Sequence, residues 1–219
     1  MKEIAVWGFS FAPPFAHGLV RDLRVRWALR EAGLPYETRL IGVEERTSAA
    51  HKQRHPFGMV PVFEADGRQL IESGAIVYAI AKESGALMPA DQASRDQTLA
   101  WMFAALNTMD VPVQALFDID VLNREEAWAP LARPHAVRNV ERRLGELADA
   151  LGERDYLLGR FTAADILMVT VLRFIRHTDL VASVPTLAAY VARCEARPAF
   201  REALGEQMAE YALNATAAA

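Results

Sequence analysis

The stretch that decides the fold is His55-Pro56-Phe57-Gly58-Met59-Val60-Pro61-Val62-Phe63, and Leu70-Ile71-Glu72-Ser73 follows it closely. Because proline donates no backbone hydrogen bond, Pro61 is expected at the start of a strand rather than inside a central one. A cis bond between Val60 and Pro61 would allow a sharp entry into that strand. It would also leave the backbone N–H and C=O of Val60 facing outward, where an extended peptide can pair with both groups.

Glu72 and Ser73 open a predicted helix immediately after the next strand. The first backbone N–H groups of a helix, together with a hydroxyl, can receive a carboxylate. A strand start and a helix start directed at one ligand therefore predict a site for a small peptide that carries a free carboxylate.

Four segments of the chain resemble the cytosolic glutathione S-transferase family, in the family's order and over nearly the whole length. Residues 24–37 resemble its first helix and the exit into its second strand. Residues 55–61 resemble its Asn-Pro-x-Gly-x-Val-Pro motif, with His55 in place of Asn. Residues 72–76 resemble its Glu-Ser-x-Ala-Ile motif, and residues 161–166 resemble the capping motif of its helical domain. The resemblance implies that the predicted peptide site binds glutathione.

The pattern of apolar residues predicts an α/β thioredoxin-like N-terminal domain, βαβαββα, over residues 1–84. Its strands are expected at 4–7, 36–41, 60–65 and 68–71, and its helices at 19–32, 48–54 and 73–83. Residues 94–219 show no strand pattern and are predicted to form an all-α helical-bundle C-terminal domain. Its helices are expected at 94–118, 134–152, 162–177, 185–197 and 200–213, and the resemblance implies that this domain forms the pocket for an electrophile.

Composition limits the function further. The net charge of −4 and the pI near 5.8 argue against nucleic acid and against an anionic membrane surface as partners. The single cysteine, Cys194, excludes an intramolecular disulfide and a cysteine zinc site, and we expect it to be a packed or partly exposed thiol inside a late helix. His51 and His55 lack a third ligand at metal spacing, so no metal is predicted. Neither a signal peptide nor a membrane-spanning run is recognised, which favours a cytoplasmic protein.

The resemblance assigns roles to four residues of the glutathione site. The backbone of Val60, set by Pro61, pairs with the cysteinyl residue of glutathione. Glu72 and Ser73 bind its γ-glutamyl end. The glycine carboxylate often meets a basic or amide side chain near residues 51–54, although for each of those residues a solvated polar helix is the favoured interpretation.

The group that activates the thiol is less clear from the sequence. Family members place a Tyr, Ser or Cys between the first strand and the first helix, where it donates a hydrogen bond to the sulfur. Counting back from residues 24–26 puts that position at Leu19-Val20-Arg21-Asp22, and counting forward from the strand puts it near Ser10. The counts disagree because residues 9–18 resemble an insertion. Ser10, Arg21 with the helix N-terminus, or no activating side chain therefore stay open.

Two further motifs lie in the helical half. Thr162 and Asp165 have the spacing of a capping box, which we interpret as a folding element. Three apolar residues of the first helix, Met102, Leu106 and Met109, are candidates for the electrophile pocket, since methionine adapts to varied apolar ligands.

The predicted function is conjugation of the glutathione thiolate, as co-substrate, to a small hydrophobic electrophile, and the resemblance implies a homodimer with residues 72–73 near its interface. One alternative is a glutathione-dependent isomerase of the maleylacetoacetate type, which would need a Ser-Ser-Cys-like loop that the chain lacks. The other is a non-catalytic glutathione-binding or interaction module on the same fold, favoured by the missing hydroxyl at residues 19–22.

Overall fold

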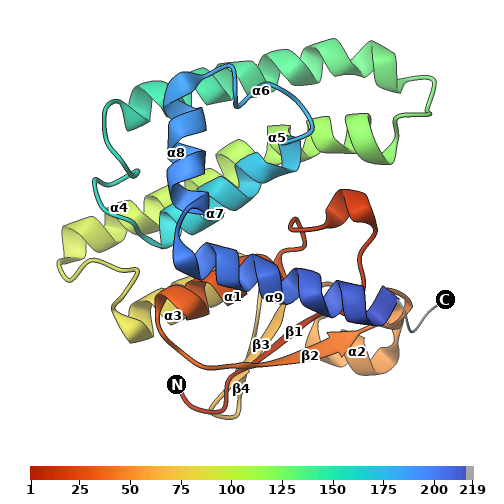
Figure 1. Ribbon diagram of the computed structural model, residues 1–219, viewed down its shortest axis with the longest axis vertical. Helices are drawn as coiled ribbons and strands as arrows, with labels where there is room; N and C mark the ends of the chain where they lie inside the picture. Colours follow the sequence, from red (N-terminus) through yellow and green to blue (C-terminus); the bar gives the residue numbers. More distant parts are fainter. Residues whose placement is uncertain (216–219) are drawn as a thin grey trace. The chain divides into compact units, whose positions relative to one another are not determined.

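The computed structural model describes residues 1–215 and divides into two compact units (Figure 1). The first comprises Met1–Leu87 together with the segment from Arg197 onward, and the second comprises Met88–Ala196. The sequence grouped the last helix with the helical domain, whereas its contacts in the structure are with the first helix of the chain. The last four residues of the predicted helical domain lie outside the described range.

The first unit is built on a four-stranded sheet in the order β2-β1-β3-β4. Its strands are β1 (Ala5–Phe9), β2 (Glu37–Ile41), β3 (Val62–Ala65) and β4 (Arg68–Ile71). β1 runs parallel to β2 and antiparallel to β3, and β3 and β4 form a hairpin. Asp66 and Gly67 both have positive φ at its turn, as a two-residue hairpin requires. The predicted order βαβαββα is confirmed.

The helices of this unit are α1 (Asp22–Glu31), α2 (Ala49–Arg54), α3 (Ser73–Ser84) and α9 (Pro198–Ala215). α1 begins three residues later than the predicted start at residue 19, because the preceding segment folds as a loop that contains a short 3-10 turn at Pro14–Ala16. Ser48 caps α2 by accepting a hydrogen bond from the His51 N–H at 3.1 Å. Pro198 occupies the first position of α9, where its missing N–H costs nothing.

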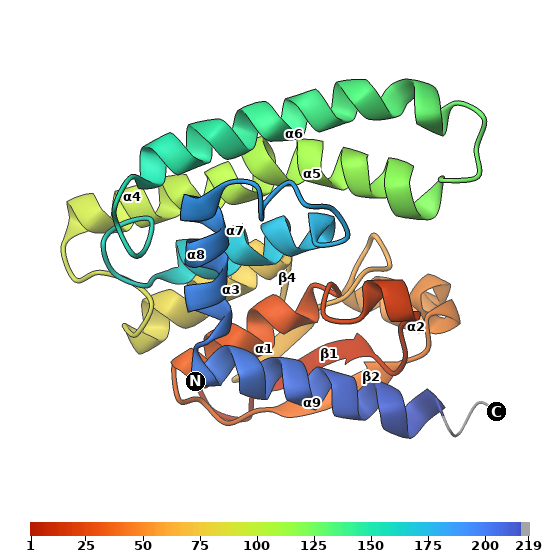
Figure 2. The same ribbon diagram turned by 45° about the horizontal axis from the view of Figure 1, so that its top comes forward.

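α9 lies alongside α1 (Figure 2) and is fixed there by polar contacts. The buried Arg26 donates to Glu210 at 2.6 Å and to the buried carboxylate of Asp22 at 2.7 Å. Gln207 donates to the other oxygen of Asp22 at 2.8 Å. Burial raises the pKa of Asp22, while Arg26 acts in the opposite direction. The Asp22 carboxylate therefore points into the unit, where it helps to hold α9 against α1.

All the regular secondary structure of the second unit, Met88–Ala196, is helical. It consists of α4 (Gln92–Phe103), α5 (Asp110–Phe117), α6 (Ala129–Leu151), α7 (Ala163–Leu172) and α8 (Pro185–Glu195). Wider π turns at Ala104–Met109 and Asp118–Leu122 continue α4 and α5. The predicted start of α6 at Pro134 is wrong: the helix begins at Ala129, with Pro130 in its first turn. No helix in the described part of the chain is long and apolar enough to cross a membrane.

α7 is the buried helix of the second unit, as the sequence predicted, and all ten of its residues are buried. Thr162 and Asp165 form the predicted capping box at its start. The Asp165 carboxylate accepts four hydrogen bonds, from the Leu157 N–H, the Thr162 N–H, the Thr162 hydroxyl and the Tyr190 hydroxyl. The start of α7 is thus closed by side chains of its own unit.

Candidate functional site

The peptide bond between Val60 and Pro61 is cis, as predicted, and β3 begins at the next residue. Val60 is buried, yet within residues 1–215 neither its N–H nor its C=O makes a hydrogen bond. The preceding carbonyl, of Met59, lies 2.9 Å from Nε2 of the buried His51, which fixes this turn from behind. The main chain of Val60 therefore offers one donor and one acceptor to an extended ligand.

The start of α3 lies beside this turn. β3 and β4 pair Val62 with Ile71, so the register places Pro61 next to Glu72. Glu72 is exposed, has a φ of +67° and occupies the N-cap position of α3, where its side chain makes no capping hydrogen bond. The first helical bond runs from the Ile76 N–H to the Glu72 C=O, which leaves the N–H groups of the first turn without intrahelical acceptors. Such a helix start favours an anionic ligand.

Ser73, the first residue of α3, is buried and contacts a buried cation. Nη1 of Arg24, on α1, donates to the Ser73 hydroxyl oxygen at 3.1 Å. The sequence did not single out Arg24, because in a helical segment that also contains Arg21, Arg26 and Arg30 nothing distinguishes an inward-facing arginine from an exposed one.

His55 lies at the same end of the unit, although the sequence assigned it no chemistry. Its ring is buried and contacts the exposed ring of Phe57 edge-on, with ring centroids 6.1 Å apart. Burial lowers the pKa of His55, while the carboxylate of Glu72 acts in the opposite direction. The motif that replaces Asn by His thus places a neutral imidazole within the electrostatic reach of the α3 start.

Ser10 and Arg21, the two candidates for activating the thiol, lie on the segment that joins β1 to α1. Ser10 directly follows β1 and donates its backbone N–H to the Ile41 C=O at 2.8 Å. Arg21 is the N-cap residue of α1 and makes no side-chain cap hydrogen bond. Both are half-buried, so the structure leaves the choice between them as a prediction.

The three pocket candidates differ in exposure. Met102 and Met109 are buried and Leu106 is half-buried within the second unit. Met109 lines a hollow of about 200 Å³ between the α4–α5 segment, α6 and α7, together with Trp101, Thr108 and Met168. The role of these residues toward an electrophile stays a prediction. Cys194 is buried, so it is a packed thiol rather than a partly exposed one.

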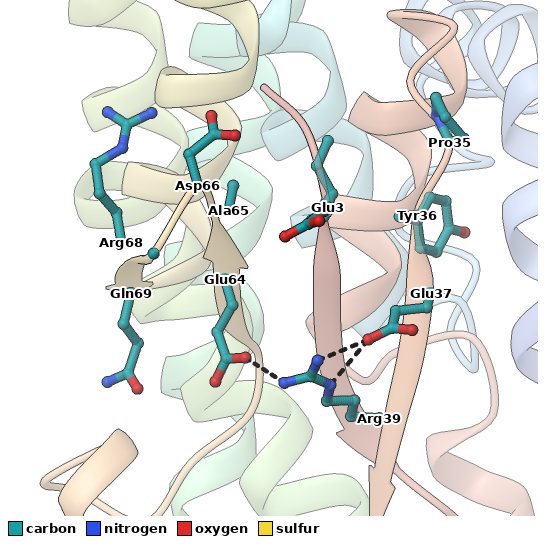
Figure 3. Close-up of a pocket in the computed structure, with 12 residues that line it drawn as sticks. Glu3, Pro35, Tyr36, Glu37, Arg39, Glu64, Ala65, Asp66, Arg68 and Gln69 are labelled. Carbon is teal, nitrogen blue, oxygen red and sulfur yellow. Dashed lines mark hydrogen bonds and ion pairs between the residues drawn. The ribbon is translucent and has the colours of Figure 1, made fainter.

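A larger hollow, of about 760 Å³, lies on the polar face of the sheet in the first unit. Figure 3 shows its charged side chains on β2 and the β3–β4 hairpin, where Arg39 bridges Glu37 and Glu64. None of the residues predicted for glutathione lines it. Within the described residues no cluster of His, Cys, Asp or Glu could hold a metal ion.

Two family models match the chain. The glutathione S-transferase N-terminal domain matches residues 23–86, and the glutathione S-transferase C-terminal domain matches residues 124–198. The chain belongs to the glutathione S-transferase family. The two matches cover the candidate glutathione residues and the capping box of α7. They leave out Ser10 and Arg21, in the segment where the sequence departs from the family pattern.

The individual relatives include a glutathione S-transferase and two proteins with other names. Glutathione S-transferase F14 of Arabidopsis thaliana is 28% identical over 192 residues, covering 80% of this chain and 75% of the relative. Maleylacetoacetate isomerase of Rhizobium meliloti is 28% identical over 193 residues, covering 82% and 89%. Elongation factor 1-gamma of Artemia salina is 34% identical over 137 residues, which are 61% of this chain but only 31% of that protein.

A solved structure gives the same answer. The theta class glutathione S-transferase of Xanthomonas axonopodis pv. citri, determined with glutathione bound, superimposes with a TM-score of 0.75 at 27% identity. The match covers 93% of this chain and 98% of that one. The match therefore extends over both units of this protein.

Proposed function

We propose that the protein is a glutathione transferase that conjugates the glutathione thiolate to a small hydrophobic electrophile. The observation that carries the proposal is that two groups able to bind a peptide lie close together. The Val60 main chain makes no hydrogen bond within residues 1–215, and the start of α3 has no side-chain cap. The register of β3 and β4 places Pro61, the residue after Val60, next to Glu72 at the start of α3. A tripeptide with a free α-carboxylate at one end fits both features at once.

The chemistry follows from this placement. The γ-glutamyl carboxylate binds Ser73 and the first-turn N–H groups of α3, and Glu72 accepts from the γ-glutamyl ammonium. The cysteinyl backbone pairs with Val60, which directs the thiol toward the segment between β1 and α1. The work of the protein is then to lower the pKa of that thiol and to position the electrophile.

The candidates for activating the thiol are Ser10 and Arg21, and the third alternative is a site with no activating side chain. A hydroxyl stabilises the thiolate by donating a hydrogen bond, and a guanidinium at a helix start stabilises it by charge. Titration of the thiolate absorbance of bound glutathione in Ser10→Ala and Arg21→Ala separates the two. The variant that raises the thiol pKa more identifies the group. A wild-type protein that leaves the thiol pKa at its solution value would contradict the transferase proposal and favour a non-catalytic glutathione-binding module.

A second candidate is a glutathione-dependent isomerase, favoured by the similarity to maleylacetoacetate isomerase over most of both chains. The sequence Leu19-Val20-Arg21-Asp22 stands against it, because a Ser-Ser-Cys-like loop is absent and Asp22 is committed to Arg26 and Gln207. Assaying purified protein with glutathione against an aryl halide and against maleylacetoacetate distinguishes the two reactions. We expect conjugation of the aryl halide, and isomerisation without conjugation would favour the alternative.

The remaining proposals concern the electrophile pocket, the oligomeric state and the location of the protein. The electrophile pocket is formed by the helical unit and includes Met102, Leu106 and Met109. The protein acts as a cytoplasmic homodimer. Sedimentation equilibrium tests the dimer, and a protein that stays monomeric at micromolar concentration would contradict it.

A further inference from the structure

Arg24 is a cation with almost no contact with solvent. It is 2% exposed, and its Nη1 donates to the hydroxyl of Ser73, which is 5% exposed. Burying a charged group is costly unless its surroundings compensate. Here one of its donors is directed at the neutral hydroxyl of the first residue of α3, in the subsite proposed for the γ-glutamyl carboxylate.

This hydrogen bond decides what the Ser73 hydroxyl can do. A serine hydroxyl has one proton to donate and two lone pairs that accept, whereas a guanidinium only donates. The bond from Arg24 therefore occupies a lone pair and leaves the proton of Ser73 for another acceptor. Among the described residues no group accepts that proton, so it is available to a ligand at the start of α3.

The positive charge of Arg24 strengthens the same arrangement. Hydrogen bonds to an ionised donor are stronger than neutral ones, and a polarised hydroxyl becomes a better donor in turn. The charge also adds to the positive end of the α3 dipole, because it lies behind the first residue of that helix. The dipole, the hydroxyl and the guanidinium all favour an anion at one place.

We infer that Arg24 is a positioning residue of the carboxylate subsite: it orients the Ser73 hydroxyl as a donor toward the γ-glutamyl α-carboxylate of glutathione and places its charge behind that hydroxyl. The inference rests on the proposed function. It assigns to Arg24 the discrimination between a free carboxylate and a neutral amide at that position of the ligand.

Calorimetry with two ligands tests this role. One ligand is glutathione, and the other is its analogue with a carboxamide in place of the γ-glutamyl α-carboxylate. We expect the wild type to bind glutathione at least tenfold more tightly than the amide. In Arg24→Gln the affinity for glutathione should fall about tenfold while the affinity for the amide changes less than twofold. Arg24→Lys, which keeps the charge and a donor, should retain more of the preference than Arg24→Gln.

Two further variants make the result specific. In the Ser73→Ala background, Arg24→Gln should cost less glutathione affinity than it does in the wild type, because the hydroxyl that Arg24 orients is gone and only the effect of its charge is left. The matched control is Arg30→Gln on the same helix, since Arg30 pairs with Glu206 rather than with α3. It should leave the ligand preference unchanged.

An Arg24→Gln protein that keeps the full preference for glutathione would overturn the inference. If substitution of Arg24 prevents folding, the wild type decides alone, and equal affinity for glutathione and the amide overturns the inference. A wild type that binds neither ligand contradicts the proposed function instead, so the two failures are distinguishable.

Discussion

Two helix starts, those of α3 and α7, answer the same physical problem in opposite ways. At α7 the Asp165 carboxylate and the Thr162 side chain satisfy the backbone donors, and Asp165 accepts two further hydrogen bonds, from Leu157 and Tyr190. At α3 the N-cap residue Glu72 makes no side-chain cap bond, and the hydroxyl of Ser73 is supported by Arg24 from behind. A helix start whose donors are satisfied by its own side chains contributes to stability, whereas one left open, with a buried cation nearby, is suited to binding an anionic ligand.

The largest expected effect is a loss of stability when the hydrogen bonds at the start of α7 are removed. Asp165→Ala would leave four buried donors without an acceptor, so we expect a loss of about 3–5 kcal/mol in the free energy of unfolding. Urea denaturation measures it. Asp155→Ala is the matched control, because the Asp155 carboxylate forms an exposed ion pair with Arg193 and its loss should change stability by less than about 1 kcal/mol. Equal stability of the two variants would contradict the structural role of the α7 start.

The next largest effect is on glutathione affinity, through Ser73 at the start of α3. Ser73→Ala removes a donor to a carboxylate, so glutathione affinity should fall by about 1–3 kcal/mol, or roughly 5- to 150-fold. The control is Ser84→Ala at the other end of α3, where the hydroxyl donates to the Ile80 C=O at 2.7 Å. Calorimetry should find its affinity unchanged. Equal affinity of wild type and Ser73→Ala would remove Ser73 from the site.

The smallest expected effect is on the pH dependence of stability, through His55 near the start of α3. Burial lowers the pKa of His55, so the folded protein binds its proton less readily than the unfolded chain does. The stability that His55 contributes as a neutral ring is therefore complete above its unfolded pKa of about 6.5 and declines as the pH falls below that value. Glu72 and His51 are the other titratable groups that act on it.

His55→Asn should flatten the decline of stability between about pH 6.5 and 5, as read from urea midpoints, because the amide does not titrate. The control is His135→Asn on the exposed face of α6, which should leave the pH profile unchanged. A wild-type stability that does not depend on pH in this range would contradict the assignment to His55.

Most of the fold was predictable from local signals. The Asp66-Gly67 turn, the proline before β3 and the Thr162–Asp165 spacing each specify backbone geometry within a few residues, and all three were correctly interpreted. The start of α6 was not, because proline is typical of the first turn of a helix, whereas Pro134 lies inside a helix whose first turn already holds Pro130. The position of α9 on α1 depends on contacts such as Arg26 with Glu210, across more than 180 residues, and no local pattern encodes it.

The candidate site divides along the same line. Val60, Pro61, Glu72 and Ser73 belong to contiguous motifs and were named from the sequence. Arg24 was missed because its function depends on being buried behind a residue of another helix, which a helical charge pattern does not reveal. The roles of Ser10 and Arg21 stay a prediction for a related reason. The sequences of β1 and α1, on either side of residues 9–18, do not determine where this segment lies relative to a bound thiol.

A crystal structure of the protein with glutathione bound tests the contrast between the two helix starts most directly. The account predicts the γ-glutamyl carboxylate within hydrogen-bond distance of the Ser73 hydroxyl and the first N–H groups of α3, and the cysteinyl backbone paired with Val60. It also predicts that the start of α7 keeps its four internal hydrogen bonds to Asp165. Glutathione bound elsewhere on the protein, with the start of α3 unoccupied, would contradict it.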